Sequence, residues 1–100
     1  MDSSVKWDEL TLAQQMVNIG TEVRRAINAE KKGNDERMKN ECLAAVNLIA
    51  LSIADARNIY RREEFLLAQR VLVDRFFGGN TYGSTAEQIT GYYDAFISAI

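Results

Sequence analysis

Histidine is absent from this sequence, so the side chains left that could do chemistry are carboxylates, lysines, arginines, tyrosines and a single cysteine. Histidine is the commonest general base and metal ligand. Its absence argues against a zinc site, a di-iron site of Glu-x-x-His pairs, and a Ser or Cys nucleophile with an imidazole partner. Glu63 and Glu64 are adjacent carboxylates, but neighbouring positions on a helix diverge by about 100° and do not converge on a substrate. We therefore predict no catalytic residue, no metal site and no cofactor, and favour a protein that is not an enzyme.

One local group of cations could bind an anion. Arg57, Arg61 and Arg62 surround Tyr60, an arrangement able to hold a phosphate, an acidic segment of a partner, or RNA. Acidic residues flank the group on both sides, so ordinary surface ion pairing is the competing interpretation. The net charge of −2 gives no overall positive field. We therefore expect no DNA partner and keep RNA only as a lesser alternative.

Polar side chains at two further places could line a pocket. Gln69 falls in the middle of an apolar helical stripe, where a buried amide needs hydrogen-bond partners, either on another helix or in a pocket. Asn80 and Tyr82 lie in the glycine-rich segment Gly78–Gly83, which lacks the preceding strand and the lysine of a P-loop and favours a helix end and a turn. The candidate pocket or anion-binding residues are Arg57, Arg61, Arg62, Gln69, Asn80 and Tyr82.

Helices must position these side chains. Proline is absent and only 6 residues are glycine, which favours long helices over strands joined by many turns. Apolar residues recur at helical spacing in four segments, so we predict helices at about residues 11–32, 35–55, 58–77 and 85–99. The first begins at Thr11, in a capping box with Gln14, or at Asp8, and ends at Gly33.

Two further boundaries depend on shorter signals. No glycine or proline ends the second helix, but one continuous helix from Asp35 to Phe77 would be about 65 Å long, too long for a domain of this size. We place a break between Asp55 and Asn58, whose side chains can turn the chain. Ser84 and Glu87 predict a capping box at the start of the last helix.

Four amphipathic helices with short connections predict a single domain, residues 1–100, that folds as an all-α, antiparallel four-helix bundle. The apolar stripe expected on the third helix consists of Phe65, Leu66, Leu72, Val73, Phe76 and Phe77. The second helix is apolar around most of its circumference, which is more apolar surface than three neighbouring helices easily cover. Its candidate interface residues are Leu43, Leu48, Ala50 and Leu51.

The cellular location follows from three simpler features. The segment Met1–Lys6 lacks the apolar stretch of a secretory signal, and no segment reaches the roughly 18 apolar residues of a membrane span. Cys42 has no second cysteine to pair with, which agrees with a reducing compartment. Its position on the core face predicts an inert, buried thiol. We expect a cytoplasmic protein without a membrane partner.

Three segments of the chain carry a resemblance: Trp7–Leu10, Asn18–Val23 and Asn80–Thr85. They resemble those of a small prokaryotic family of uncharacterised helical-bundle proteins of roughly a hundred residues, and the similarity covers nearly the whole chain. The resemblance implies a stand-alone prokaryotic domain and brings no catalytic residue with it. In architecture alone, the chain is also similar to the helical partner proteins of minimal nucleotidyltransferases, although no motif supports that comparison.

These observations favour a non-enzymatic protein-interaction or assembly module, either a homodimer or the partner of another protein. The alternative is a ligand-binding or nucleotidyltransferase-partner protein with a pocket between its helices, near Arg62, Gln69 and the Gly78–Gly83 segment. A second alternative is an RNA-binding protein that uses Tyr60, Arg61 and Arg62, for which affinity would fall steeply with salt.

Overall fold

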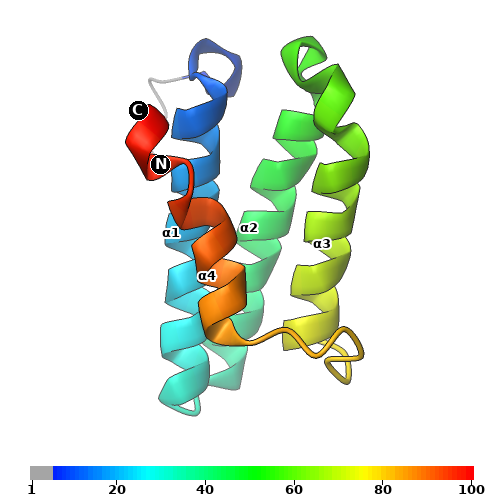
Figure 1. Cartoon of the computed structure of the whole chain (residues 1–100). Coiled ribbons are helices and arrows are strands. Elements are labelled where there is room, and N and C mark those ends of the chain that lie inside the picture. Colours follow the sequence, from blue (N-terminus) through cyan, green and yellow to red (C-terminus); the bar gives the residue numbers. More distant parts are fainter. Residues whose placement is uncertain (1–5) are drawn as a thin grey trace.

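The computed structural model describes residues 6–100, which form helices and turns without a strand. The α-helices are α1 (Leu12–Lys31), α2 (Asp35–Ala54), α3 (Arg62–Phe76) and α4 (Ala86–Asp94), and the short 3₁₀ helices are η1 (Trp7–Glu9), η2 (Ala56–Arg61) and η3 (Ile97–Ala99). Successive α-helices run in alternate directions (Figure 1), so the predicted four-helix bundle is confirmed. The prediction made from Met1–Lys6 concerns a segment that lies, apart from Lys6, outside the described residues.

The helix ends follow local capping chemistry. Thr11 and Gln14 form the predicted capping box, and Gly33 lies in the first connection with a φ of 71°. The predicted box at the start of the last helix was wrong by one residue. Thr85, in place of Ser84, caps α4, and its partner is Gln88. A shift of one residue is within the ambiguity of a Ser-Thr pair, since both hydroxyls can cap a helix.

The chain turns between α2 and α3 where the break was predicted. Asp55 has extended backbone angles, and Asn58 has a non-helical φ of −100° and ψ of 15°. The following residues form the 3₁₀ helix η2, so α3 begins at Arg62, later than the predicted residue 58. The last helix is likewise shorter than predicted, because the backbone changes to i→i−3 hydrogen bonds from Phe96 onward.

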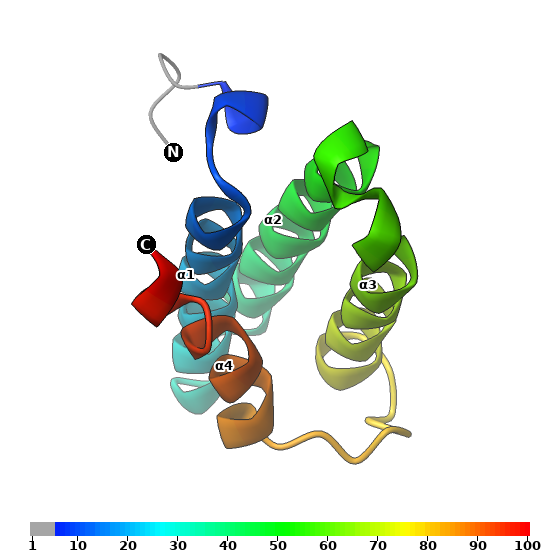
Figure 2. The same ribbon diagram turned by 45° about the horizontal axis from the view of Figure 1, so that its top comes forward.

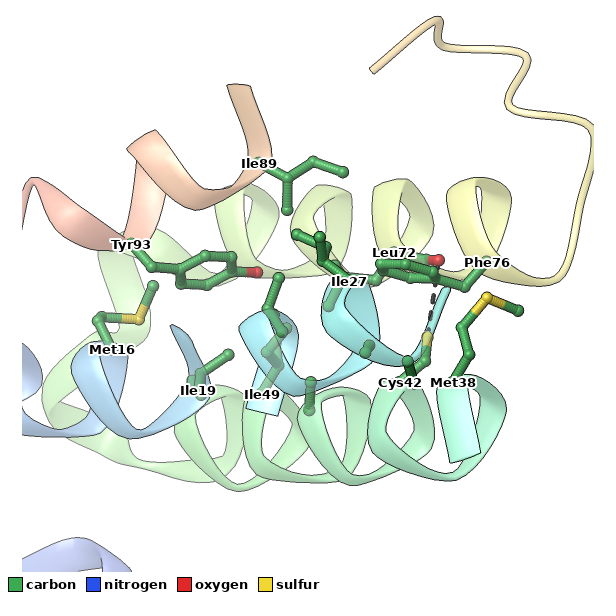
Figure 3. Packing of buried hydrophobic residues seen from close by; sticks show 14 of the residues in the cluster. Met16, Ile19, Ile27, Met38, Cys42, Ile49, Leu72, Phe76, Ile89 and Tyr93 are labelled. Carbon is green, nitrogen blue, oxygen red and sulfur yellow. Dashed lines mark hydrogen bonds between the residues drawn. The ribbon is translucent and has the colours of Figure 1, made fainter. Parts of the chain in front are cut away.

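The core lies between α1, α2 and α3 and is closed on one side by α4 (Figure 3). Met16, Ile19, Ile49, Phe65 and Leu72 are among its most completely buried side chains. Burying a side chain of this size typically contributes about 1.5–3 kcal/mol. Cys42 also lies in this core, 1% exposed, and burial raises the pKa of its thiol to about 11. The predicted burial of the thiol is therefore confirmed, and a raised pKa disfavours the reactive thiolate.

The third helix buries only half of its predicted stripe. Phe65, Leu72 and Phe76 are buried, whereas Leu66, Val73 and Phe77 are 38%, 42% and 43% exposed. The three exposed residues lie about 80–120° around the helix from Phe65, on the flank that no neighbouring helix covers. The rest of the fold therefore covers only half of the predicted stripe.

Helix α4 packs mainly against α1, and α3 stands apart from it (Figure 2). The close approach occurs at Gly20, where a Cβ added to the glycine backbone would lie 2.8 Å from Cβ of Tyr93. Within residues 6–100, no single helix has both the length and the apolar composition needed to cross a bilayer. The α2 and η2–α3 segments meet both conditions only when they are taken together, and this pair is bent by 109°.

The contact at Gly20 makes a stability prediction. Gly20→Ala is expected to lower the free energy of unfolding by about 1 kcal/mol, because an overpacking cost of about 1–3 kcal/mol exceeds the gain in helix propensity. Gly91→Ala is the matched control, since nothing lies within 4 Å of a Cβ there; it should raise stability by about 0.5–1 kcal/mol. Urea unfolding followed by circular dichroism measures both. Equal stabilisation by the two substitutions would contradict the close approach.

Candidate functional site

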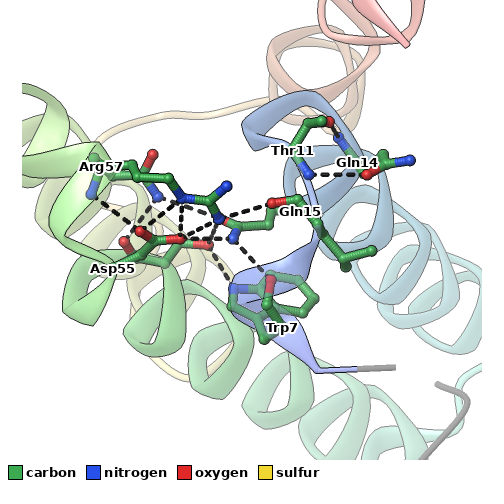
Figure 4. Close-up of polar contacts among 9 residues, drawn as sticks. Trp7, Thr11, Gln14, Gln15, Asp55 and Arg57 are labelled. Carbon is green, nitrogen blue, oxygen red and sulfur yellow. Dashed lines mark hydrogen bonds and ion pairs between the residues drawn. The ribbon is translucent and has the colours of Figure 1, made fainter. Parts of the chain in front are cut away.

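Arg57, the first of the candidate anion-binding residues, is held by its own chain. Its guanidinium donates to Asp55 at 2.6 Å and to the carbonyl of Leu10 at 2.8 Å. Figure 4 shows this contact beside the start of α1. The Arg57 hydrogen bonds hold the pKa of Asp55 well below its ordinary value. The structure therefore gives Arg57 the role of joining η2 to the segment before α1.

This pairing predicts an acid-dependent loss of stability. A carboxyl with a lowered folded pKa stabilises the fold above its unfolded pKa of about 3.9, and that stability is lost as pH falls through the folded pKa. Asp55→Asn should therefore cost about 1 kcal/mol at pH 7, and the difference from wild type should shrink below about pH 4. Thermal unfolding across this pH range measures it. Glu9→Gln, at an exposed carboxyl, is the control; a pH-independent difference for Asp55→Asn would contradict the ion pair.

The structure places Arg61, Arg62 and Tyr60 in different surroundings. Arg61 pairs with Glu64 at 3.2 Å and its guanidinium carbon lies 5.6 Å from the centre of the Phe96 ring. Arg62 is exposed at the first position of α3, and Tyr60 is 100% exposed. The structure therefore leaves Tyr60 and Arg62 accessible, while Arg61 links α3 to the chain after α4.

Gln69, Asn80 and Tyr82 also take up separate positions. The Gln69 amide donates to the carbonyl of Val46 on α2 at 3.1 Å, the inter-helix hydrogen bond considered for it. The Asn80 side chain accepts from the Ser84 amide at 3.0 Å and organises the loop before α4. The backbone N–H of Tyr82 donates to the Asp74 carboxylate at 3.0 Å, while its ring is 55% exposed. The six candidate residues therefore do not form a common pocket.

A buried polar cluster that the sequence analysis missed lies at the η1 end of the bundle. Gln15 is 0% exposed and its amide donates to the Trp7 carbonyl and to Asp55, at 3.1 Å each. Its oxygen accepts from Ser52 at 2.9 Å and from Asn58 at 3.2 Å. The four hydrogen bonds satisfy the amide fully, so the cluster fixes η1, α1, α2 and η2 to one another.

The candidate interface residues of α2 are mostly accessible. Leu43 and Leu51 are 47% and 46% exposed, and Ala50 is exposed between them. Leu48 differs, because it is half-buried and packs against the core. The outer face of α2 therefore carries two solvent-exposed leucines, Leu43 and Leu51.

A larger apolar surface lies on η2 and α3. Six of the eleven large apolar side chains that are exposed within residues 6–100 belong to it, which makes it the main apolar surface of the described chain. We call these residues the α3 outer surface: Ile59, Tyr60, Leu66, Leu67, Val73 and Phe77. A shallow groove lined by Val46, Leu66 and Val73 connects this surface to α2. The width of the apolar stripe on the third helix was the sequence signal for it.

A second hollow separates α3 from α4 and has a volume of about 200 Å³. Its walls are mainly apolar, with Leu67, Val71 and Ile89 among them. The Tyr92 hydroxyl donates to the Glu64 carboxylate across it, and burial followed by this hydrogen bond raises the pKa of Tyr92. This groove between α3 and α4 is therefore mainly apolar and is crossed by one hydrogen bond.

The carboxylates do not assemble into a metal centre within residues 6–100. Glu22 lies beside Glu41 across α1 and α2, and burial, followed by the hydrogen bond with Glu41, raises the pKa of Glu22. Glu22 pairs with Arg25 at 2.9 Å and Glu41 with Arg37 at 3.8 Å. Each carboxylate thus has a counter-ion on its own helix, an arrangement typical of surface ion pairs.

Comparison with protein-family models, curated proteins and solved structures finds no match for the chain. The fold and the surfaces described above define a small, all-helical bundle protein of 100 residues.

Proposed function

We propose that this protein is a non-enzymatic interaction module that assembles with a second copy of itself. The observation that carries the proposal is the concentration of exposed apolar side chains on the α3 outer surface. Several large apolar side chains exposed on one part of a protein are typical of association sites. We also propose that the chain belongs to the small prokaryotic family that it resembles. That family is uncharacterised, so it suggests no other function.

The chemistry of this surface fits association. Tyr60 is fully exposed, and aromatic residues are enriched at protein interfaces because they bury a large area with few rotatable bonds. The groove lined by Val46, Leu66 and Val73 extends the surface onto α2, where Leu43 and Ala50 are also exposed. Both helices are therefore available to one partner.

Sedimentation velocity over a range of protein concentrations tests the proposal. We expect the mean mass to rise from 11.3 kDa toward twice that value. The double variant Leu66→Ser/Val73→Ser should remain monomeric, because both side chains are exposed and their loss removes apolar contacts without opening the core. Leu51→Ser, on α2, tests whether that helix takes part. A wild-type protein that stays monomeric at about 100 µM, where micromolar association is nearly complete, would contradict the proposal.

The groove between α3 and α4 supports a second candidate, the binding of a small apolar ligand. Its volume of about 200 Å³ is below the usual range of ligand pockets, about 300–1,000 Å³, so only a short aliphatic or single-ring group fits. Nuclear magnetic resonance titration with hexanoate should shift the signals of Ile89 and Tyr92. Leu67→Trp, which fills the groove from its rim, should abolish those shifts. Absence of any shift in the wild-type protein would dispose of this candidate.

A further inference from the structure

We propose that two copies pair through antiparallel packing of α3 against α3 about a two-fold axis that passes between Leu66 and Leu67. This inference rests on the self-association proposed above and specifies its geometry. It follows from the positions of two charges that flank the apolar centre of the α3 outer surface.

Glu63 and Arg70 lie with Leu66 and Leu67 around one shallow hollow on the exposed side of α3. Glu64 also lines this hollow, but its carboxylate is already paired with Arg61. The Glu63 carboxylate lies one turn before the leucines and the Arg70 guanidinium one turn after them, seven positions apart and about 10.5 Å along the helix. None of the ion pairs found within residues 6–100 involves Glu63 or Arg70. Two opposite charges on one face are thus available to a partner.

The spacing is self-complementary only in one orientation. Glu63 and Arg70 are equally distant from the midpoint between Leu66 and Leu67, so an antiparallel copy places each glutamate opposite the other copy's arginine. A two-fold axis repeats the contact, giving two ion pairs around a leucine centre. A parallel arrangement would instead bring Glu63 to Glu63 and Arg70 to Arg70, which is repulsive. The charges therefore favour a second copy, and an antiparallel one.

The same midpoint relates two further members of the surface. Tyr60 and Val73 are equally distant from it in the sequence, Tyr60 in η2 and Val73 in α3, so the antiparallel copy brings Val73 toward the η2 end that carries the fully exposed Tyr60. Contacts between an aromatic ring and an aliphatic side chain at this position would cover apolar area beyond the two leucines. The pairing thus accounts for the apolar residues on both sides of the charges.

Charge reversal followed by sedimentation equilibrium tests the pairing. Glu63→Arg and Arg70→Glu each place like charges at both symmetric contacts and should weaken dimerisation by about 10- to 30-fold. The double variant Glu63→Arg/Arg70→Glu should restore wild-type affinity. An equimolar mixture of the two single variants should form a heterodimer, because both of its contacts again join opposite charges. All three variants change exposed residues, and circular dichroism checks that each is folded.

Each possible result of these experiments either supports or overturns the antiparallel pairing. Restoration by the double variant and heterodimer formation in the mixture would support the antiparallel pairing. A wild-type dimer that is unaffected by either reversal but dissociated by Leu66→Ser/Val73→Ser would overturn the pairing and leave the interaction role intact. A monomeric wild-type protein at about 100 µM would overturn both.

Discussion

Replacing Phe65 with Ala is expected to lower the free energy of unfolding by about 3–5 kcal/mol. The ring is 0% exposed and belongs to the core cluster between the helices. Its removal takes away the transfer free energy of a large apolar group and leaves a cavity that rigid helices cannot fill. A loss of this size is a large share of the roughly 5–15 kcal/mol that stabilises a typical domain, so partial unfolding at 25 °C is an expected result.

The adjacent residue provides the control for Phe65. Leu66→Ala removes a side chain that is 38% exposed and should cost at most about 1 kcal/mol in the monomer. Urea unfolding at low protein concentration measures both variants without interference from association. Similar losses for the two substitutions would show that α3 is rotated about its axis relative to the structure described above.

Replacing Gln15 with Met is expected to cost about 3 kcal/mol, although the two side chains have similar volumes. The substitution removes four hydrogen bonds at once and leaves the Trp7 carbonyl, the Ser52 hydroxyl and the Asn58 amide short of a partner. A buried polar group without a partner costs about 1–3 kcal/mol, and part of that cost is recovered when water reaches the cluster.

Tryptophan fluorescence gives the Gln15 variant a local readout. Trp7, the only tryptophan, is 7% exposed and donates to the Ser52 hydroxyl at 3.0 Å. Loosening of the cluster should shift its emission to longer wavelength before global unfolding begins. Gln69→Met is the control, because that amide makes a single hydrogen bond to Val46, and should change stability by less than about 1 kcal/mol. Unchanged emission and stability in Gln15→Met would contradict the buried cluster.

The helical pattern of the sequence was sufficient to predict the bundle, because apolar spacing and caps are local properties. Thr11, Gly33 and Asn34 each mark a helix end by the chemistry of one or two residues. The Gln15 cluster could not be predicted in the same way. Ser52 and Asn58 lie 37 and 43 positions further along the chain and meet Gln15 only once the helices have packed, and no periodicity encodes that meeting.

The surface residues show the same limit for the candidate site. A helical stripe indicates which side chains share a face, but the extent to which neighbours cover that face is a property of packing. Leu66 and Val73 belong to the predicted stripe and remain exposed because they lie on the flank of α3 beside α2, where only a shallow groove with Val46 forms. The arginines were predicted by charge alone, and the structure distributes them among different partners.

Because α4 packs against α1 at Gly20, the folding of this last α-helix depends on the presence of α1. A helix of nine residues does not persist by itself in water, so α4 depends on its packing against α1. That close packing is possible because Gly20 of α1 has no side chain. Ile89 and Tyr93, which α4 contributes to the core, would both be uncovered if that contact were lost. Loss of α4 would therefore open the core on the side that this helix closes.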